Sequence, residues 1–150
     1  VMHGDAAMSG QGVVYEAACL AKLPAFTTAG AVHVVVNNQL GFTTAQRDGR
    51  SADYCTDVAK LGGAAVLHVN AERVTEVVRA AELAMRFRAR FGADVVLDLV
   101  GYRRHGHNEL DDASFTQPTM YEHIRARPTV IDAYARQCVA DGVVSADEHA

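Results

Sequence analysis

The chain has 150 residues, of which 49% are hydrophobic and 21% are charged, a composition typical of soluble globular proteins. Its net charge is −4 with the two signs interspersed, so it lacks the basic patch expected of a nucleic-acid-binding domain. No apolar run is long enough to span a bilayer, which excludes a transmembrane segment in these residues.

The predicted elements alternate between strand and helix from the start of the chain. A first strand ends at His3 and leads through a turn of small residues at 6–10 into a helix over residues 12–22. Apolar runs predict further strands at 31–36, 65–69 and 94–100, with helices at 71–91 and 129–141. These runs are continuous instead of alternating, which is typical of parallel strands buried on both faces. The sequence therefore predicts an α/β fold in which a parallel sheet carries helices on both faces.

The helix at 71–91 has the clearest pattern. Its valine, alanine and methionine side chains recur every three or four residues along one face. Asn70 suits the N-cap position, and Gly92 suits the residue just past the C-terminal end. The pattern becomes helical again after Pro118.

The two ends of the sequence resemble interrupted elements, and its cysteines indicate the state of the thiols. The first residues fit the end of a strand, and the last six, SADEHA, fit the first turn of a helix. We therefore expect residues 1–150 to be an internal fragment, part of one domain of a longer chain. The three cysteines are far apart and form no C-x-x-C pair, which favours free thiols over a disulfide framework or a zinc site.

Small or polar residues follow three of the predicted strands. GDAAMSGQG follows the first strand, NNQLGFTTAQRDGRS the second, and GYRRHGHNELDDASFTQP the last. In parallel sheets ligands bind outside the carboxyl ends of the strands, and long loops there are more often functional than idle.

Asp5 and Asn38 stand at the start of two of these segments. Mg²⁺ prefers oxygen ligands and often keeps phosphate oxygens among them. A carboxylate, an amide oxygen and a backbone carbonyl at adjacent strand ends would supply half of its shell, and the N–H groups of the turn at 6–10 would help to receive an anion. Taken alone, each residue is more often explained as a turn residue that satisfies local backbone groups.

Four segments together resemble a known family. GDAAMSGQGVVYEA, VVVNNQLGFTT, YRRHGHNELDD and FTQPTMY occur in this order over residues 1–130. They resemble the thiamine diphosphate-dependent first component of 2-oxoglutarate dehydrogenase complexes. The general thiamine diphosphate motif begins Gly-Asp-Gly and closes about thirty residues later with Asn-Asn. Ala6 departs from that motif, and the 2-oxoglutarate subfamily shares the alanine.

The resemblance implies a set of site residues. Asp5, the side chain of Asn38 and the backbone carbonyl of Leu40 would bind Mg²⁺, which holds the diphosphate of the cofactor. Ala6 belongs to the same cofactor-binding turn. His107, in the GHNE segment, resembles an active-site histidine that binds the substrate or stabilises charge during decarboxylation.

The resemblance also implies an activity for the whole protein. It would be an oxoglutarate dehydrogenase that uses thiamine diphosphate and Mg²⁺ in the citric acid cycle and transfers the succinyl group to lipoyl groups. Its partners would be the dihydrolipoyl succinyltransferase and dihydrolipoyl dehydrogenase components. A homodimer is implied, in the mitochondrial matrix of a eukaryote or the cytoplasm of a bacterium. The family's activating glutamate and upstream substrate-binding histidines lie outside these residues, so we expect this piece alone to be inactive.

Several alternatives stay open. The 2-oxoadipate dehydrogenase component shares GDA, NNQ-x-G and GHNE; HIRARP favours it, whereas YRRHGHNE favours 2-oxoglutarate. Pyruvate and branched-chain enzymes are closer to the Gly-Asp-Gly form. A non-catalytic homologue that serves assembly is a different class, although Asp5 and Asn38 are both present. A dinucleotide-binding Rossmann domain lacks support, because no G-x-G-x-x-G follows a strand.

Other residues receive structural interpretations. His105 and His107 with a nearby acid suggest a transition-metal site, but the sequence offers no matching third ligand. His33 and His68 lie within apolar strands and are interpreted as core histidines with satisfied partners. Cys55 has no paired base and is not expected to be a nucleophile.

Three further features lie in the loops. The loop at 39–57 is expected to pack over the cofactor or to face a partner subunit. Asn37 is expected to organise the turn after its strand. Arg103 and Arg104 are explained equally well as groups that handle a dianionic substrate and as surface or subunit-contact residues.

Overall fold

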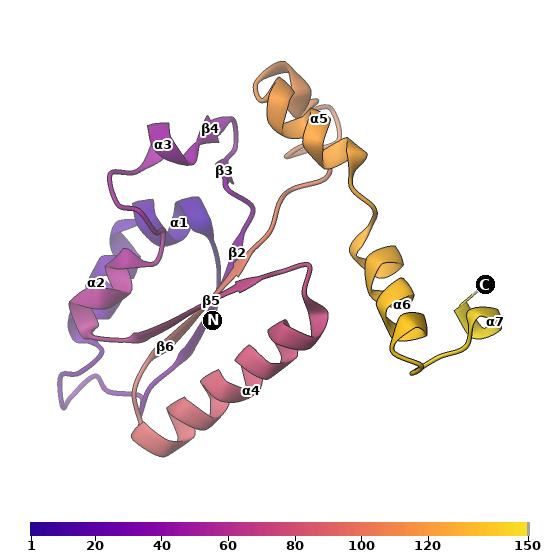
Figure 1. Cartoon of the computed structure of the whole chain (residues 1–150). Helices are drawn as coiled ribbons and strands as arrows, with labels where there is room; N and C mark the ends of the chain where they lie inside the picture. The colour runs from indigo at the N-terminus through magenta and orange to yellow at the C-terminus, as the bar shows by residue number, and fades with distance from the viewer. Residues whose placement is uncertain (150) are drawn as a thin grey trace.

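The structure is a computed structural model that describes residues 1–149, and its centre is a four-stranded parallel sheet (Figure 1). The strands lie in the order β1, β2, β6, β5, and comprise Met2–Gly4, Val32–Asn37, Val95–Val100 and Ala65–Asn70. Every neighbouring pair is parallel, so all four carboxyl ends lie at the same edge of the sheet. The predicted strands and their parallel arrangement are confirmed.

Helices cover both faces of the sheet, as predicted (Figure 1). Helix α4 (Val74–Phe91) packs against one face, where it contacts β2, β5 and β6. The opposite face carries α1 (Asp5–Gly10), α2 (Gly12–Leu20) and the 3₁₀ helix η1 (Asp57–Gly62). The core on this second face consists of Met8, Val35, Cys55, Val58, Ala59 and Val96.

Helix α4 begins at Val74, later than the sequence predicted, and Asn70 is not its N-cap. Asn70 ends β5, and its Oδ1 accepts the Glu72 N–H at 2.9 Å in a local turn. The chain therefore needs this turn before the helix can start. The other end is as predicted: Gly92 has a φ of 58° and donates its N–H to the Arg88 carbonyl, a left-handed cap that favours glycine.

Two segments that we interpreted as turn and loop contain short elements. The small residues after β1 form α1 instead of an irregular turn, because alanine and methionine favour helix; within α1, Ser9 Oγ donates to the Asp5 carbonyl at 3.1 Å. The long loop after β2 contains the hairpin β3 (Leu40–Gly41) and β4 (Thr44–Ala45), followed by α3 (Gln46–Gly49).

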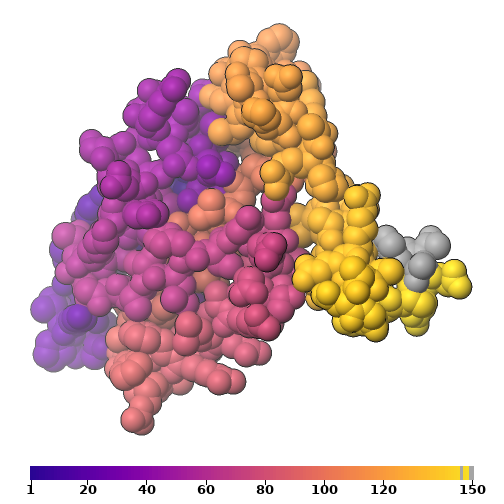
Figure 2. Space-filling view, in the orientation of Figure 1, coloured from indigo at the N-terminus to yellow at the C-terminus, as the bar shows by residue number. Residues whose placement is uncertain are grey.

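After β6 the chain leaves the sheet (Figures 1 and 2). The elements of this part are η2 (Ala113–Phe115), α5 (Pro118–Ala126), α6 (Val130–Ala140) and α7 (Ala146–His149). The helices predicted after Pro118 and at 129–141 are thus confirmed. A second buried cluster fastens α5 to the segment after β2, and it consists of Leu40, Ala113, Tyr121 and Ile124.

No helix within the described residues combines the length and apolarity needed to cross a membrane. The cysteines are free thiols, as predicted: Cys19 is exposed, Cys55 is buried, and Cys138 lies between these extremes.

Candidate functional site

The carboxyl edge of the sheet places Asp5 beside the end of β2. Gly4 pairs with Val36, so Asp5, which follows β1 directly, lies next to the residues that follow β2. Asp5 is only 3% exposed, and its carboxyl group lies beside the backbone N–H groups of Ala6 and Asn38. The start of α1 therefore places Asp5 beside the backbone of Asn38.

The carboxylate of Asp5 is unusual because it is buried without an ion pair among the described residues. Burial raises the pKa of Asp5 above its ordinary value, whereas nearby backbone N–H groups and the charge of Arg50 oppose this rise. A buried carboxylate is costly unless a cation or hydrogen bonds compensate it. The position of Asp5 is thus suited to a metal ligand.

The segment after β2 brings Asn38 and Leu40 against α1. Asn38 Oδ1 accepts the Leu40 N–H at 3.0 Å, and an amide oxygen has a second lone pair for a further partner. Gly41 packs directly on Ala6, because a Cβ built at Gly41 would lie 3.0 Å from the Ala6 Cβ. The segment at 40–41 therefore packs against α1, which carries Asp5 and Ala6, whereas Asn38 lines a different hollow from the one against Asp5.

The backbone on both sides of Leu40 is strained. Gln39 and Phe42 have φ values of 67° and 57°, a left-handed conformation that costs about 1 kcal/mol or more for such residues. The loop after β6 holds both: Gln39 Nε2 donates to the Gly101 carbonyl at 2.6 Å, and Arg103 Nη2 donates to the Phe42 carbonyl at 3.0 Å. Tertiary contacts therefore impose the bend around Leu40.

A hollow of about 230 Å³ opens against Asp5, and Ala6, Gly41 and Arg50 also line it. Arg50 Nε is buried and, among residues 1–149, is the one buried side-chain nitrogen or oxygen without a hydrogen-bond partner. The hollow thus brings the negative charge of Asp5, which suits a cation, close to the positive charge of Arg50, which suits an anion; Arg50 Nη2 donates to Gln46 Oε1 at 2.7 Å. These groups fit Mg²⁺ with a bound diphosphate.

Arg50 was not found from the sequence. A single arginine in a long loop carries no signal in its spacing, and its place beside Asp5 depends on how the segment after β4 folds back. Within the described residues, no three His, Cys, Asp or Glu side chains gather as a metal site. The candidate site rests on one carboxylate, one amide oxygen and one backbone carbonyl.

Asn37 organises the turn after β2, as expected. Its Oδ1 accepts the Gln39 N–H at 3.1 Å, and its Nδ2 donates to Asp98 Oδ1 at 3.1 Å. Asp98 is 1% exposed, and its other oxygen binds His68 Nδ1 at 2.8 Å. A buried chain of hydrogen bonds therefore joins the turn to the middle of the sheet.

The two histidines interpreted as core residues, His33 and His68, both have partners, but of these two only His33 is partly buried. The side chain of His68 is 37% exposed and packs against the Tyr54 ring, so its interpretation as a core residue is wrong. β5 lies at the edge of the sheet, and the face that carries His68 is only partly covered. An apolar strand can therefore still expose one of its side chains. His33 is partly buried and its Nδ1 bonds His3 Nε2 at 2.9 Å.

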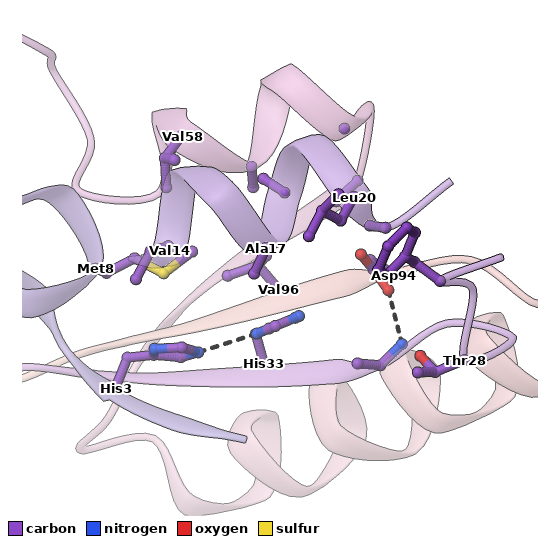
Figure 3. Close-up of a pocket in the computed structure, with 17 residues that line it drawn as sticks. His3, Met8, Val14, Ala17, Leu20, Thr28, His33, Val58, Asp94 and Val96 are labelled. Atoms are coloured by element: carbon purple, nitrogen blue, oxygen red, sulfur yellow. Dashed lines mark hydrogen bonds between the residues drawn. The ribbon is translucent and has the colours of Figure 1, made fainter. Parts of the chain in front are cut away.

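The His3–His33 pair lines an apolar cavity of about 310 Å³ between the sheet and α2 (Figure 3). Burial lowers the pKa of both imidazoles, and the neighbouring His33 lowers that of His3 further. Asp94, at the start of β6, also lines this cavity. The cavity therefore lies toward the amino ends of the strands, away from Asp5.

His107 lies on the loop after β6 and faces the segment that contains Leu40. Its ring is 4.9 Å from the Phe42 ring, and its backbone N–H donates to Asp111 Oδ2 at 2.8 Å. The loop is tightly folded, since a Cβ at Gly106 would lie 1.9 Å from the Asp111 carbonyl oxygen. The structure thus places the predicted catalytic histidine at the same edge of the sheet as the predicted metal ligands.

Cys55 is expected to resist alkylation. Burial, with the nearby Asp98 carboxylate, raises the pKa of its thiol to about 12, so almost none is thiolate at neutral pH. We expect iodoacetamide to modify Cys55 on the order of 1,000-fold more slowly than an ordinary thiol. Peptide mass spectrometry after brief labelling, with the exposed Cys19 as internal reference, measures this ratio. Comparable labelling of the two cysteines in folded protein would contradict it.

Known proteins resemble this chain throughout its length. The family model described as dehydrogenase E1 component matches residues 1–150. The chain is 48% identical over 147 residues to the human 2-oxoadipate dehydrogenase complex component E1, and 47% identical over 147 residues to the zebrafish protein of that name. It is 51% identical over 148 residues to the rat protein named 2-oxoglutarate dehydrogenase-like, mitochondrial.

These matches cover 98% of the chain for the human and zebrafish proteins and 99% for the rat protein. The chain spans only 16% of the human and zebrafish relatives and 15% of the rat relative. The parallel sheet, the edge that gathers Asp5 with Leu40, and the match over residues 1–150 agree with one another. The chain belongs to the dehydrogenase E1 component family.

Proposed function

We propose that residues 1–150 form part of the diphosphate-binding domain of a thiamine diphosphate- and Mg²⁺-dependent 2-oxo acid dehydrogenase, with 2-oxoglutarate as the substrate. The observation that carries this proposal is the buried carboxylate of Asp5, which has no ion pair among the described residues. It lies at the carboxyl edge of the sheet, close to the segment that contains Asn38 and Leu40. The similarity to E1 components of 2-oxo acid dehydrogenase complexes supports it.

Each residue has a distinct role in this proposal. Asp5, the Asn38 side chain and the Leu40 carbonyl would hold Mg²⁺, and Ala6 allows the backbone to approach the diphosphate. The positive charge of Arg50, which lines the same hollow, would attract the phosphate oxygens. Thiamine diphosphate, when bound, supplies the electron sink for loss of carbon dioxide. His107 would hydrogen-bond the 2-oxo acid and stabilise the charge that develops on it.

The proposal also covers the partner proteins, the oligomeric state and the cellular compartment. The acyl group would pass to lipoyl groups of a dihydrolipoyl succinyltransferase, and dihydrolipoyl dehydrogenase would reoxidise them. A homodimer of the full-length chain, in the mitochondrial matrix of a eukaryote or the cytoplasm of a bacterium, completes the proposal. The rat relative is named as mitochondrial, which supports the first setting.

The first experiment compares kcat/KM for 2-oxoglutarate and 2-oxoadipate with the full-length enzyme. Thiamine diphosphate and Mg²⁺ are present, and an artificial electron acceptor replaces the other components. We expect turnover that is lost on chelation of the metal, with 2-oxoglutarate preferred. Turnover of neither acid by protein that binds the cofactor would contradict the catalytic proposal and favour a non-catalytic assembly role.

A second candidate function has specific support. The human and zebrafish relatives are named for 2-oxoadipate, and their identities of 48% and 47% are close to the 51% of the 2-oxoglutarate dehydrogenase-like protein. A preference for 2-oxoadipate in the same assay would keep the metal site and the role of His107. It would move the protein from the citric acid cycle to lysine degradation.

A further inference from the structure

The Arg103 guanidinium joins the two loops at the carboxyl edge of the sheet. Its Nη2 donates to the Phe42 carbonyl at 3.0 Å, its Nε to the Tyr121 hydroxyl at 3.4 Å, and its Nη1 lies 3.4 Å from His107 Nδ1. Asp111 Oδ2 lies 3.9 Å from Nη2. The Arg103 side chain is only 13% exposed, which argues against the alternative that it is a free surface residue.

The contact with His107 has a chemical consequence. A guanidinium has five N–H donors and no acceptor, and it stays protonated in proteins. The imidazole nitrogen that faces it must therefore accept, so Nδ1 of His107 carries no proton. The other nitrogen, Nε2, then carries the proton and is a donor.

The remaining contacts fix the orientation of the same ring. The backbone N–H of His107 is held by Asp111 Oδ2 at 2.8 Å, and the Phe42 ring lies 4.9 Å away at an angle of 59°. Arg103 binds the carbonyl of that same Phe42. One side chain thus sets both the tautomer of His107 and the position of the ring against which it packs.

We propose that Arg103 is a positioning residue that holds His107 as a hydrogen-bond donor through Nε2–H. The proposal rests on the proposed function, in which His107 meets a 2-oxo acid. In this form His107 donates to a carbonyl or carboxylate oxygen of the substrate and stabilises negative charge there. It does not take a proton from the substrate at Nε2, because that nitrogen is already protonated.

Steady-state kinetics of the full-length enzyme at saturating thiamine diphosphate and Mg²⁺ test the proposal. We expect Arg103→Met to lower kcat about 10- to 100-fold, the scale of a misplaced transition-state hydrogen bond, with KM for the 2-oxo acid changed less than about threefold. Arg103→Lys should recover part of this loss, since an ammonium keeps the charge and can donate to His107 but lacks the planar fork that reaches all three partners. Arg104→Met is the matched control, because Arg104 bonds the Tyr102 hydroxyl and the carbonyls of the segment at 127–128.

A double-mutant cycle separates positioning from a structural role. In a His107→Ala background, Arg103→Met should lower kcat no further, because Arg103 acts through His107. An equal loss of kcat from Arg103→Met with and without His107 would overturn the proposal. An equal loss from Arg104→Met would overturn it too, since that arginine does not set the tautomer.

The tautomer itself provides a readout that does not depend on turnover. ¹⁵N chemical shifts of labelled full-length enzyme distinguish protonated from unprotonated ring nitrogens, and the His107→Ala variant identifies the signals. We expect an unprotonated Nδ1 in the natural protein and a mixture of tautomers in Arg103→Met. A protonated Nδ1 in the natural protein would overturn the proposal. Absence of 2-oxo acid turnover with this tautomer present would instead contradict the proposed function.

Discussion

Replacement of Asp5 by asparagine is expected to weaken Mg²⁺-dependent binding of thiamine diphosphate at least about 100-fold, beyond the loss seen when outer partners of a metal site are removed. The amide keeps one oxygen but loses the charge that attracts the cation. Without metal, the same change should leave the protein as stable or more stable, by about 1 kcal/mol, since it removes a buried carboxylate that has no ion pair among the described residues.

Titration calorimetry of the full-length protein measures the first effect, and hydrogen exchange of peptides from β1 and β2 measures the second. Asp48→Asn is the matched control, because Asp48 lies on α3 with a 63% exposed side chain and the same charge is lost. Metal-dependent binding that survived Asp5→Asn within about threefold would remove Asp5 from the metal site.

Replacement of Asp98 by alanine is expected to destabilise the sheet by about 2–4 kcal/mol. Asp98 accepts the Asn37 amide at 3.1 Å and binds His68 Nδ1 at 2.8 Å. Its removal leaves the Asn37 donor buried without its oxygen partner and leaves a void on that face of the sheet. His68→Ala should cost less, about 1 kcal/mol, because the His68 side chain is 37% exposed and water can reach the Asp98 oxygen.

The free energy of local opening, from native-state hydrogen exchange over 32–37 and 95–100, measures this loss. Asp94→Ala is the matched control at the other end of the same strand, where one carboxylate oxygen accepts the Ala31 N–H at 2.8 Å, an interaction worth about 1 kcal/mol. If Asp98→Ala were no more destabilising than Asp94→Ala, the hydrogen-bond chain through Asn37 would not stabilise the sheet.

The sheet could be predicted because its signal is local. The runs at 31–36, 65–69 and 94–100 are continuous apolar stretches, and burial on both faces requires that composition. The role of Gly92 as the C-terminal cap of α4 could also be predicted, because a left-handed cap favours glycine in any helix. Asn70 was misread because one side chain can cap a helix or a local turn, and the sequence does not say which N–H it will accept.

Only part of the candidate site could be predicted from the sequence. Asp5 and Asn38 stand directly after predicted strands, so sheet topology alone suggests that they meet. The contacts of Arg103 and Asp98, and the approach of Arg50 to Asp5, join residues far apart in sequence. They depend on how loops fold back onto the sheet, and no pattern of spacing encodes that.

The strained residues on either side of Leu40 have a thermodynamic consequence. Gln39 and Phe42 are both held by the segment that follows β6, which also carries His107. A ligand that orders one of these segments reduces the conformational entropy that remains to be lost when the other is ordered. If the proposed ligands bind at Leu40 and at His107, their binding would share a coupling free energy, and each ligand would raise the affinity for the other by the same factor.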